Sequence, residues 1–159
     1  MTAEAKTVSR LKFLARVVSK ECKHLATTNE RLFTDQFTLA QAIRLENDPD
    51  LSEQVDAFVS RFGRLQDTVG DKLLPLLLAA LGEKPGAAID NLDRAERLGL
   101  MKSADEWIAM RTLRNQMVHE YIEDPVVLSS ALQTGHAFVP VLITAANNMI
   151  NEVKRRGWA

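Results

Sequence analysis

Residues that can bind phosphate and move protons lie close together in the segment LRNQMVHEYIEDP, residues 113–125: Arg114, Asn115, His119 and Tyr121. An arginine stays charged at every relevant pH and offers a planar fork of N–H donors to phosphate oxygens, whereas a histidine titrates near neutrality. If His119 takes the proton from a ribose 2′-hydroxyl, that oxygen can attack the adjacent phosphate while Arg114 stabilises the developing charge. This chemistry requires no metal, and Asn115 would orient the histidine or the phosphate.

These residues fall on a predicted helix. Ser103 and Glu106 form a capping-box pattern, so we expect the helix to run from Ser103 to about Tyr121. Its apolar stripe consists of Trp107, Met110, Leu113 and Met117, with Tyr121 at the end. Arg111, Asn115 and His119 are four residues apart and therefore form a second, polar stripe.

Arg114 does not share the stripe of His119. Five residues separate the two, which corresponds to about 140° around a helix and roughly 7.5 Å along it. A second helix or a second subunit would be needed to complete a pocket around both. From spacing alone, an ordinary exposed polar face explains the same residues.

The order of the residues adds to the spacing. Residues 114–121, RNQMVHEY, resemble the R-x4-H-x-Y signature of HEPN-domain toxins, including the asparagine often found after the arginine. The resemblance implies a single HEPN-like helical domain over residues 1–159, which forms a homodimer whose two motif helices line a cleft. It also implies metal-independent ribonuclease activity with Arg114 and His119 as catalytic residues. Asn115 and Arg111 share the stripe of His119 and are expected in supporting positions.

The tyrosine implies a partner. HEPN toxins with H-x-Y look like those paired with an MNT-type nucleotidyltransferase, an antitoxin that transfers AMP from ATP to the tyrosine hydroxyl. Tyr121 would then be the modified residue, because an added nucleotide places bulk and negative charge where an RNA phosphate should bind. Tyr121 could equally be an aromatic residue of the core or dimer interface. Glu120 departs from the pattern, since an acid beside the RNA phosphate costs affinity unless it points away or pairs with Arg111.

A function from another class fits the same residues. The chain could be a non-catalytic helical adaptor that recruits a nucleotidyltransferase and presents a ligand or its own tyrosine. Both hypotheses predict a homodimer and a nucleotidyltransferase partner. They differ at His119, which only the ribonuclease requires.

Composition indicates one globular domain, and the motifs give no reason to expect a cofactor. The 159 residues are 46% apolar and 26% charged, with only seven glycines and five prolines. The single cysteine, Cys22, and a charged N-terminus predict a cytoplasmic protein. We expect no stretch to span a membrane, because no window holds a long uncharged apolar run and LLPLLLAALG is too short. Cys22, His24, His119 and His136 lack metal-ligand spacing, so we expect no metal site. Without a glycine-rich phosphate loop, ATP should bind the partner and not this chain.

The apolar periodicity predicts an all-α fold, an antiparallel up-and-down bundle of five or six helices. The apolar stripes of the first, third and last helices are expected to face the core: Val8, Leu11, Ala15, Val18, Cys22 and Leu25; Val55, Phe58, Phe62, Leu65, Val69, Leu73 and Leu76; and Leu128, Ala131, Gly135, Phe138, Leu142, Ala145, Met149 and Val153. We expect helices over residues 4–31, 35–46, 50–82, 85–98, 103–121 and 125–156. Asp50 and Glu53 are expected to cap the third, and Pro75 to bend it. Asp124 is expected to cap the last helix, with Pro125 at its first position. Gly99 should terminate the fourth in the left-handed conformation, with Leu98 and Leu100 packing around it.

Lysines and arginines gather on the first helix. Lys12, Arg16, Lys20 and Lys23 share one face, in a protein whose net charge is only −1. Two interpretations remain open: a local patch for nucleic acid, or a solvated face opposite a buried one.

Overall fold

The computed structural model describes residues 4–119 and 123–159, and all regular structure in these ranges is helical. If α3, the π-helical segment after it and α4 are counted as one continuous helix, the described residues form six helices, in agreement with the predicted bundle. The helices are α1 (Ala5–Leu32), α2 (Leu39–Arg44), α3 (Pro49–Asp67), α4 (Leu74–Ala80), α5 (Ala88–Arg97), α6 (Ala104–His119) and α7 (Pro125–Arg155).

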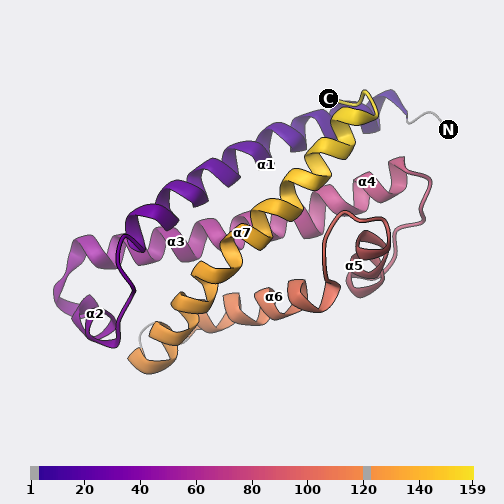
Figure 1. Ribbon diagram of the computed structural model, residues 1–159. Coiled ribbons are helices and arrows are strands. Elements are labelled where there is room, and N and C mark those ends of the chain that lie inside the picture. Colours follow the sequence, from indigo (N-terminus) through magenta and orange to yellow (C-terminus); the bar gives the residue numbers. More distant parts are fainter. Residues whose placement is uncertain (1–3, 120–122) are drawn as a thin grey trace.

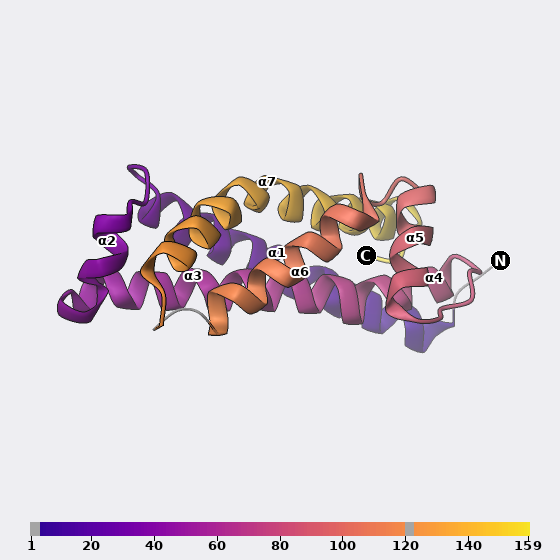
Figure 2. The ribbon, with the colours of Figure 1, turned by 90° about the horizontal axis from the view of Figure 1, so that it is seen from below.

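Four long helical rods alternate in direction along the molecule (Figure 1). Helix α1 packs against α3 and α7, and α6 completes the ring by packing against both α3 and α7. The short α2 closes one end of the bundle, whereas α5 lies near the other end beside α6 (Figures 1 and 2). Each long helix therefore has two main neighbours, and a surface groove can form at each of the four seams.

The core contains most of the residues that the periodicity predicts. Leu11, Val18 and Leu25 of α1 are fully buried, as are Val55, Phe58 and Phe62 of α3. Leu142 and Met149 of α7 are also fully buried. The predicted stripes are thus confirmed as the inner faces of the bundle.

Pro75 changes the register of the long second rod. Proline cannot donate the hydrogen bond of a regular helix and crowds the preceding turn. The chain accommodates it with a π-helical segment, Thr68–Leu73, in which the Leu74 N–H donates to the Val69 carbonyl. Because a π turn inserts one residue, the buried position moves from the expected Leu76, which is half-buried, to Leu77, which is fully buried.

Several predicted helix starts are wrong. The second helix was expected to begin at Asp35 but begins at Leu39, because Thr38 and Gln41 form a capping box there. Helix α3 begins at Pro49, with Asp48 accepting a 3.1 Å hydrogen bond from the Leu51 N–H, so the expected Asp50–Glu53 box does not form the cap.

The fourth predicted helix, which is α5, is also shorter than expected. Helix α5 starts at Ala88, three residues after Pro85. Its end is confirmed: Gly99 has φ +75°, and the Leu100 N–H donates to the Ala95 carbonyl at 2.9 Å. Leu100 is buried, as predicted, whereas Leu98 is exposed.

The ends of the segment that carries the motif agree with the sequence in part. The Ser103 hydroxyl accepts a hydrogen bond from the Glu106 N–H at 3.1 Å, which is one half of the predicted capping box. Asp124 caps α7, because its carboxylate accepts hydrogen bonds from the N–H groups of Val126 and Val127. Within the described residues α6 ends at His119, close to the predicted end.

Helix α7 corrects one expectation. Residues 125–150 contain no Asp, Glu, Lys or Arg, and by length and composition α7 could cross a membrane, contrary to the prediction that no stretch could. It packs along α1, α2 and α6, and its inner face forms part of the core. A core helix of a bundle meets the same criteria of length and composition.

Candidate functional site

Helix α6 is held closely against the α3–α4 rod. The predicted apolar stripe is confirmed within the described residues: Trp107, Met110, Leu113 and Met117 are all buried. A Cβ at Gly70 would lie 3.1 Å from Trp107 Nε1, so the absence of a side chain there leaves room for the indole. The Gln66 side-chain amide also donates to the Trp107 carbonyl at 3.3 Å. These contacts fix how α6 faces α3.

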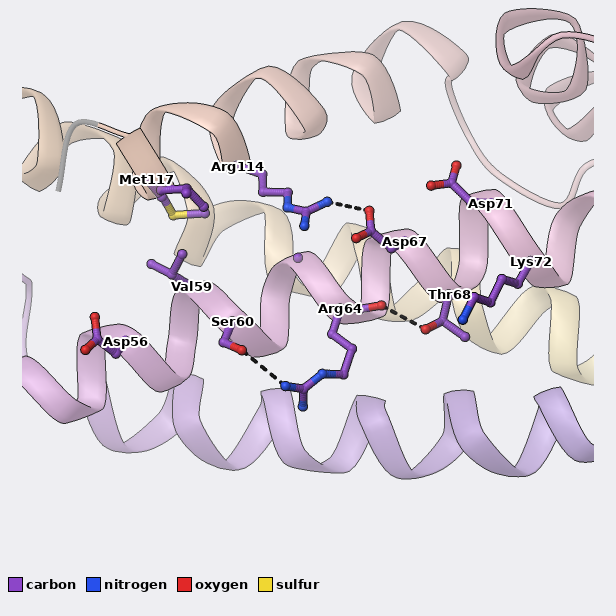
Figure 3. A pocket seen from close by; sticks show the side chains of 12 residues that line it. Asp56, Val59, Ser60, Arg64, Asp67, Thr68, Asp71, Lys72, Arg114 and Met117 are labelled. Carbon is purple, nitrogen blue, oxygen red and sulfur yellow. Dashed lines mark hydrogen bonds and ion pairs between the residues drawn. The ribbon is translucent and has the colours of Figure 1, made fainter.

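A groove of about 800 Å³ lies along α3 and the π-helical segment with α6 at one edge, and we call it the α3–α6 groove. Arg114 reaches into it from α6, whereas Arg64 points away from α6 (Figure 3). Its apolar lining includes Val59, Met117 and Val118. Its charged lining is balanced, with three cations, Arg64, Lys72 and Arg114, and three anions, Asp56, Asp67 and Asp71. The groove therefore holds three cationic groups without an overall positive charge.

Both arginines of the motif helix pair with carboxylates across this groove. Arg114 donates a hydrogen bond to Asp67, and Arg111 donates one to Asp71 at 2.5 Å. The Arg114 and Asp67 side chains are 31% and 39% exposed, respectively. At this exposure an ion pair contributes about 0–1 kcal/mol to stability. Another anion can therefore displace Asp67 from Arg114 at little cost.

Gly63 provides the surface on which the Arg114 side chain lies. A Cβ at Gly63 would be 2.6 Å from Arg114 Nε, closer than atoms can approach, and 3.1 Å from Arg114 Cζ, which is a tight contact. The missing side chain allows the guanidinium to lie against the α3 backbone and reach Asp67. The position of Arg114 therefore depends on α3 as much as on α6.

The structure does not bring all the predicted site residues together. Arg114 lines the α3–α6 groove, whereas Asn115 and His119 are exposed and are not part of its lining. Arg111 lies at the edge of the groove through its contact with Asp71. Tyr121 lies outside the described residues, as does Glu120. A single chain thus places the Arg114 guanidinium in the groove and the His119 imidazole, which is exposed, outside it.

A buried carboxylate lies behind the groove. Glu21 of α1 is 9% exposed and accepts a hydrogen bond from the Thr68 hydroxyl at 3.2 Å, while its other oxygen has no partner among the described residues. Burial raises the pKa of Glu21, and the Thr68 hydrogen bond and the nearby Arg64 oppose that rise.

Sequence reasoning missed Gly63, Asp67 and Asp71. Gly63 and Gly70 are seven residues apart on one helix, a spacing that places both on the same face and indicates close approach of another helix. Asp67 and Asp71 are four residues apart on that face. This signal was present in the sequence, although it does not say which helix approaches.

Among the described residues, no group of three or more His, Cys, Asp or Glu side chains is placed to hold a metal ion. Burial raises the pKa of the Cys22 thiol to about 11, so this cysteine is not poised as a nucleophile. In comparisons with known proteins, no family model, no curated protein and no solved structure matches the chain.

Proposed function

We propose that the chain is the toxin of a toxin–antitoxin pair, a HEPN-like, metal-independent endoribonuclease that uses Arg114 and His119. The observation that carries this proposal is that α6 presents two suitable groups. The Arg114 guanidinium lies in a groove and is held by a weak ion pair, and the His119 imidazole, five residues later, is exposed. The R-x4-H-x-Y order of residues 114–121 supports the same function. It would act on RNA in the cytoplasm.

The reaction needs only groups of the chain and the RNA itself. The His119 imidazole takes the proton of a ribose 2′-hydroxyl, and O2′ attacks the adjacent phosphorus. The bond from phosphorus to the 5′-oxygen breaks, and that oxygen takes up a proton from water while His119 returns its proton to water, which leaves a 2′,3′-cyclic phosphate and a 5′-hydroxyl. Arg114, after leaving Asp67, neutralises the charge that builds on the phosphoryl oxygens.

A second copy of the chain would complete the site. Arg114 and His119 face different sides of α6, so one phosphodiester cannot easily contact both within one chain. Next to His119 and Asn115, the outward face of α6 exposes Ile108 and Val118. Two-fold pairing through this face would bring two α6 helices together and is the commonest form of oligomer. The homodimer is therefore part of the proposal.

The antitoxin is proposed to be a nucleotidyltransferase of the MNT type that adds AMP to Tyr121. Tyr121 follows His119 by two residues, so a nucleotide attached there would add a phosphate and a base close to the imidazole. The added negative charge would compete with the RNA phosphate for Arg114. Supporting roles go to Asn115, exposed beside His119, and to Arg111, whose contact with Asp71 keeps that carboxylate away from Arg114.

The test is RNA cleavage in EDTA by the chain purified without its partner, with the intact mass checked for added AMP. We expect cleavage that yields 2′,3′-cyclic phosphate ends, because the 2′-hydroxyl is the nucleophile. An oligonucleotide with a 2′-deoxyribose at the cleaved position should remain intact. The absence of cleavage by unmodified protein would instead support the adaptor of a nucleotidyltransferase as the function.

Gly63→Ala tests whether the groove positions Arg114 for this reaction. The new methyl group would occupy the place of the Arg114 side chain, which is flexible, so the fold should survive while the guanidinium moves. We expect kcat/KM for RNA to fall on the order of 10- to 100-fold, the effect of an ångström-scale misplacement.

Gly86→Ala is the matched control for Gly63→Ala. A Cβ at Gly86 would meet nothing closer than 3.7 Å, so this variant should cleave RNA like the wild type. Circular dichroism and thermal unfolding of both variants would show that helicity is kept. Full activity in Gly63→Ala would mean that Arg114 works equally well in another position, against the proposed geometry.

A further inference from the structure

The basic face of α1 belongs to a groove that the sequence could not show. Lys12, Arg16, Lys20 and Lys23 line it from α1, and Lys154 joins them from the end of α7, more than a hundred residues away in the chain. All five side chains are exposed, and none forms an ion pair with another described residue. We call these five residues the basic stripe.

The stripe is separate from the proposed catalytic groove. It follows the seam between α1 and α7, whereas the α3–α6 groove lies on the diagonally opposite seam of the bundle (Figure 1). No acidic side chain is among the residues that line it, in contrast to the balanced α3–α6 groove. With a net charge of −1 for the whole protein, this concentration of positive charge is local.

The length of the basic stripe suits an extended polymer strand. The floor of its groove contains buried Ala15 and Ile150, and the volume of the groove is about 390 Å³. From Lys12 to Lys23 the α1 helix rises about 16 Å, at 1.5 Å for each residue. At about 3.4 Å for each nucleotide of a stacked strand, that length matches roughly five phosphates.

An exposed aromatic ring adjoins the stripe. Phe13 is 42% exposed, and the guanidinium carbons of Arg10 and Arg16 lie 5.0 and 6.0 Å from its ring centroid. Cations that track a backbone, combined with an aromatic ring on which a base can stack, are features of sites for single-stranded nucleic acid. A helix that binds a membrane surface would expose several apolar side chains beside its cations, and Phe13 is the one large hydrophobic residue exposed on the described part of α1.

We propose that the basic stripe binds the phosphate backbone of single-stranded nucleic acid without sequence preference, while Phe13 stacks on a base. The inference goes beyond the proposed ribonuclease and does not depend on it, because the stripe contains none of the residues assigned to cleavage. In a ribonuclease, the stripe would hold RNA at a second contact away from the cleaved bond. Its affinity arises mainly from counterion release and must fall steeply with salt.

The test uses a fluorescein-labelled single-stranded 2′-deoxy-oligouridylate of twelve nucleotides, which lacks the 2′-hydroxyl needed for cleavage. Fluorescence anisotropy against NaCl concentration gives the affinity and its salt slope. The variant Lys12→Gln/Lys20→Gln/Lys23→Gln should bind on the order of 10- to 100-fold more weakly, and its slope should decrease by about 2, near 0.7 for each lost contact. Arg16 is kept, so that its contact with Phe13 is undisturbed.

A matched control variant removes three positive charges from another part of the surface. Lys84→Gln/Arg97→Gln/Lys102→Gln replaces three exposed cations outside α1 and α7, and it should bind like the wild type. Phe13→Ala should weaken binding several-fold without changing the slope, because stacking releases no counterions. Equal weakening by the two triple variants would overturn the proposal, as it would show a response to net charge only.

Two further probes separate other polyanions. Vesicles of phosphatidylserine and phosphatidylcholine, and a twelve-residue polyglutamate peptide, are measured at the same ionic strength. Binding of either in place of the oligonucleotide, with loss in the Lys12→Gln/Lys20→Gln/Lys23→Gln variant, would assign the stripe to a membrane or an acidic protein and refute the nucleic-acid site. Because no probe can be cleaved, a failure here is distinguishable from a failure of the ribonuclease proposal.

Discussion

Replacing His119 by alanine is expected to lower kcat/KM for RNA cleavage by about 10²- to 10⁴-fold, the contribution of a positioned general base. The side chain is exposed and has no hydrogen-bond partner among the described residues, so its removal should leave helicity and unfolding unchanged. Cleavage of a labelled RNA in EDTA, followed by gel electrophoresis, measures the effect. Since the imidazole acts on the reacting bond, KM should change much less than kcat.

The control for His119→Ala is His24→Ala. His24 is also exposed and lies on α1, away from α6 and the α3–α6 groove, so this variant should keep full activity. If His119→Ala cleaves RNA as fast as the wild type, His119 is a surface residue and not the general base, and the catalytic assignment is refuted. In that case growth arrest on expression should also persist in His119→Ala.

The fold and the helix that carries the candidate site could be predicted because they depend on local patterns. The stripe Trp107, Met110, Leu113 and Met117 repeats at helical spacing, and the structure buries all four residues. Helix ends with their own chemistry, such as Gly99 and Asp124, were also found from sequence. Where two candidate caps lay close together, as at Asp48 and Asp50, the spacing alone selected the wrong one, because Pro49 fixes the start of the helix.

The partners of the motif arginines could not be predicted, since they depend on how α6 faces α3. Arg114 and Asp67 are 47 residues apart in sequence, and each has other opposite charges nearer in the chain. The π-helical segment also changes which residues of the α3–α4 rod face inward. A prediction from periodicity assumes one regular helix and therefore loses the register at Pro75.

Arg114→Ala is the second large effect that we expect, a fall in kcat/KM on the order of 10²- to 10³-fold, as for the loss of one group that stabilises transition-state charge. Arg114→Lys should recover only part of it, because an ammonium cannot donate two parallel hydrogen bonds to a phosphate. Gel-based cleavage rates and the midpoint of urea unfolding should be measured on the same preparations.

Arg114 also pairs with Asp67, so a structural role must be separated from a catalytic one. Arg111→Ala is the matched variant: it removes a similarly exposed ion pair one turn away, with Asp71. Both alanine variants should lose less than about 1 kcal/mol of unfolding free energy. Only Arg114→Ala should lose most of its RNA-cleavage activity, while kcat/KM of Arg111→Ala should fall by less than about tenfold.

Asp67 provides the remaining distinction. If Asp67 competes with the RNA phosphate for Arg114, Asp67→Ala should lower KM for RNA, because the guanidinium is then free before substrate binds. The double variant Arg114→Ala/Asp67→Ala removes the unpaired carboxylate that Arg114→Ala leaves behind, yet it should stay inactive. Recovery of cleavage in the double variant would mean that the loss in Arg114→Ala came from that carboxylate in the groove, and that Arg114 serves the ion pair and not the phosphate.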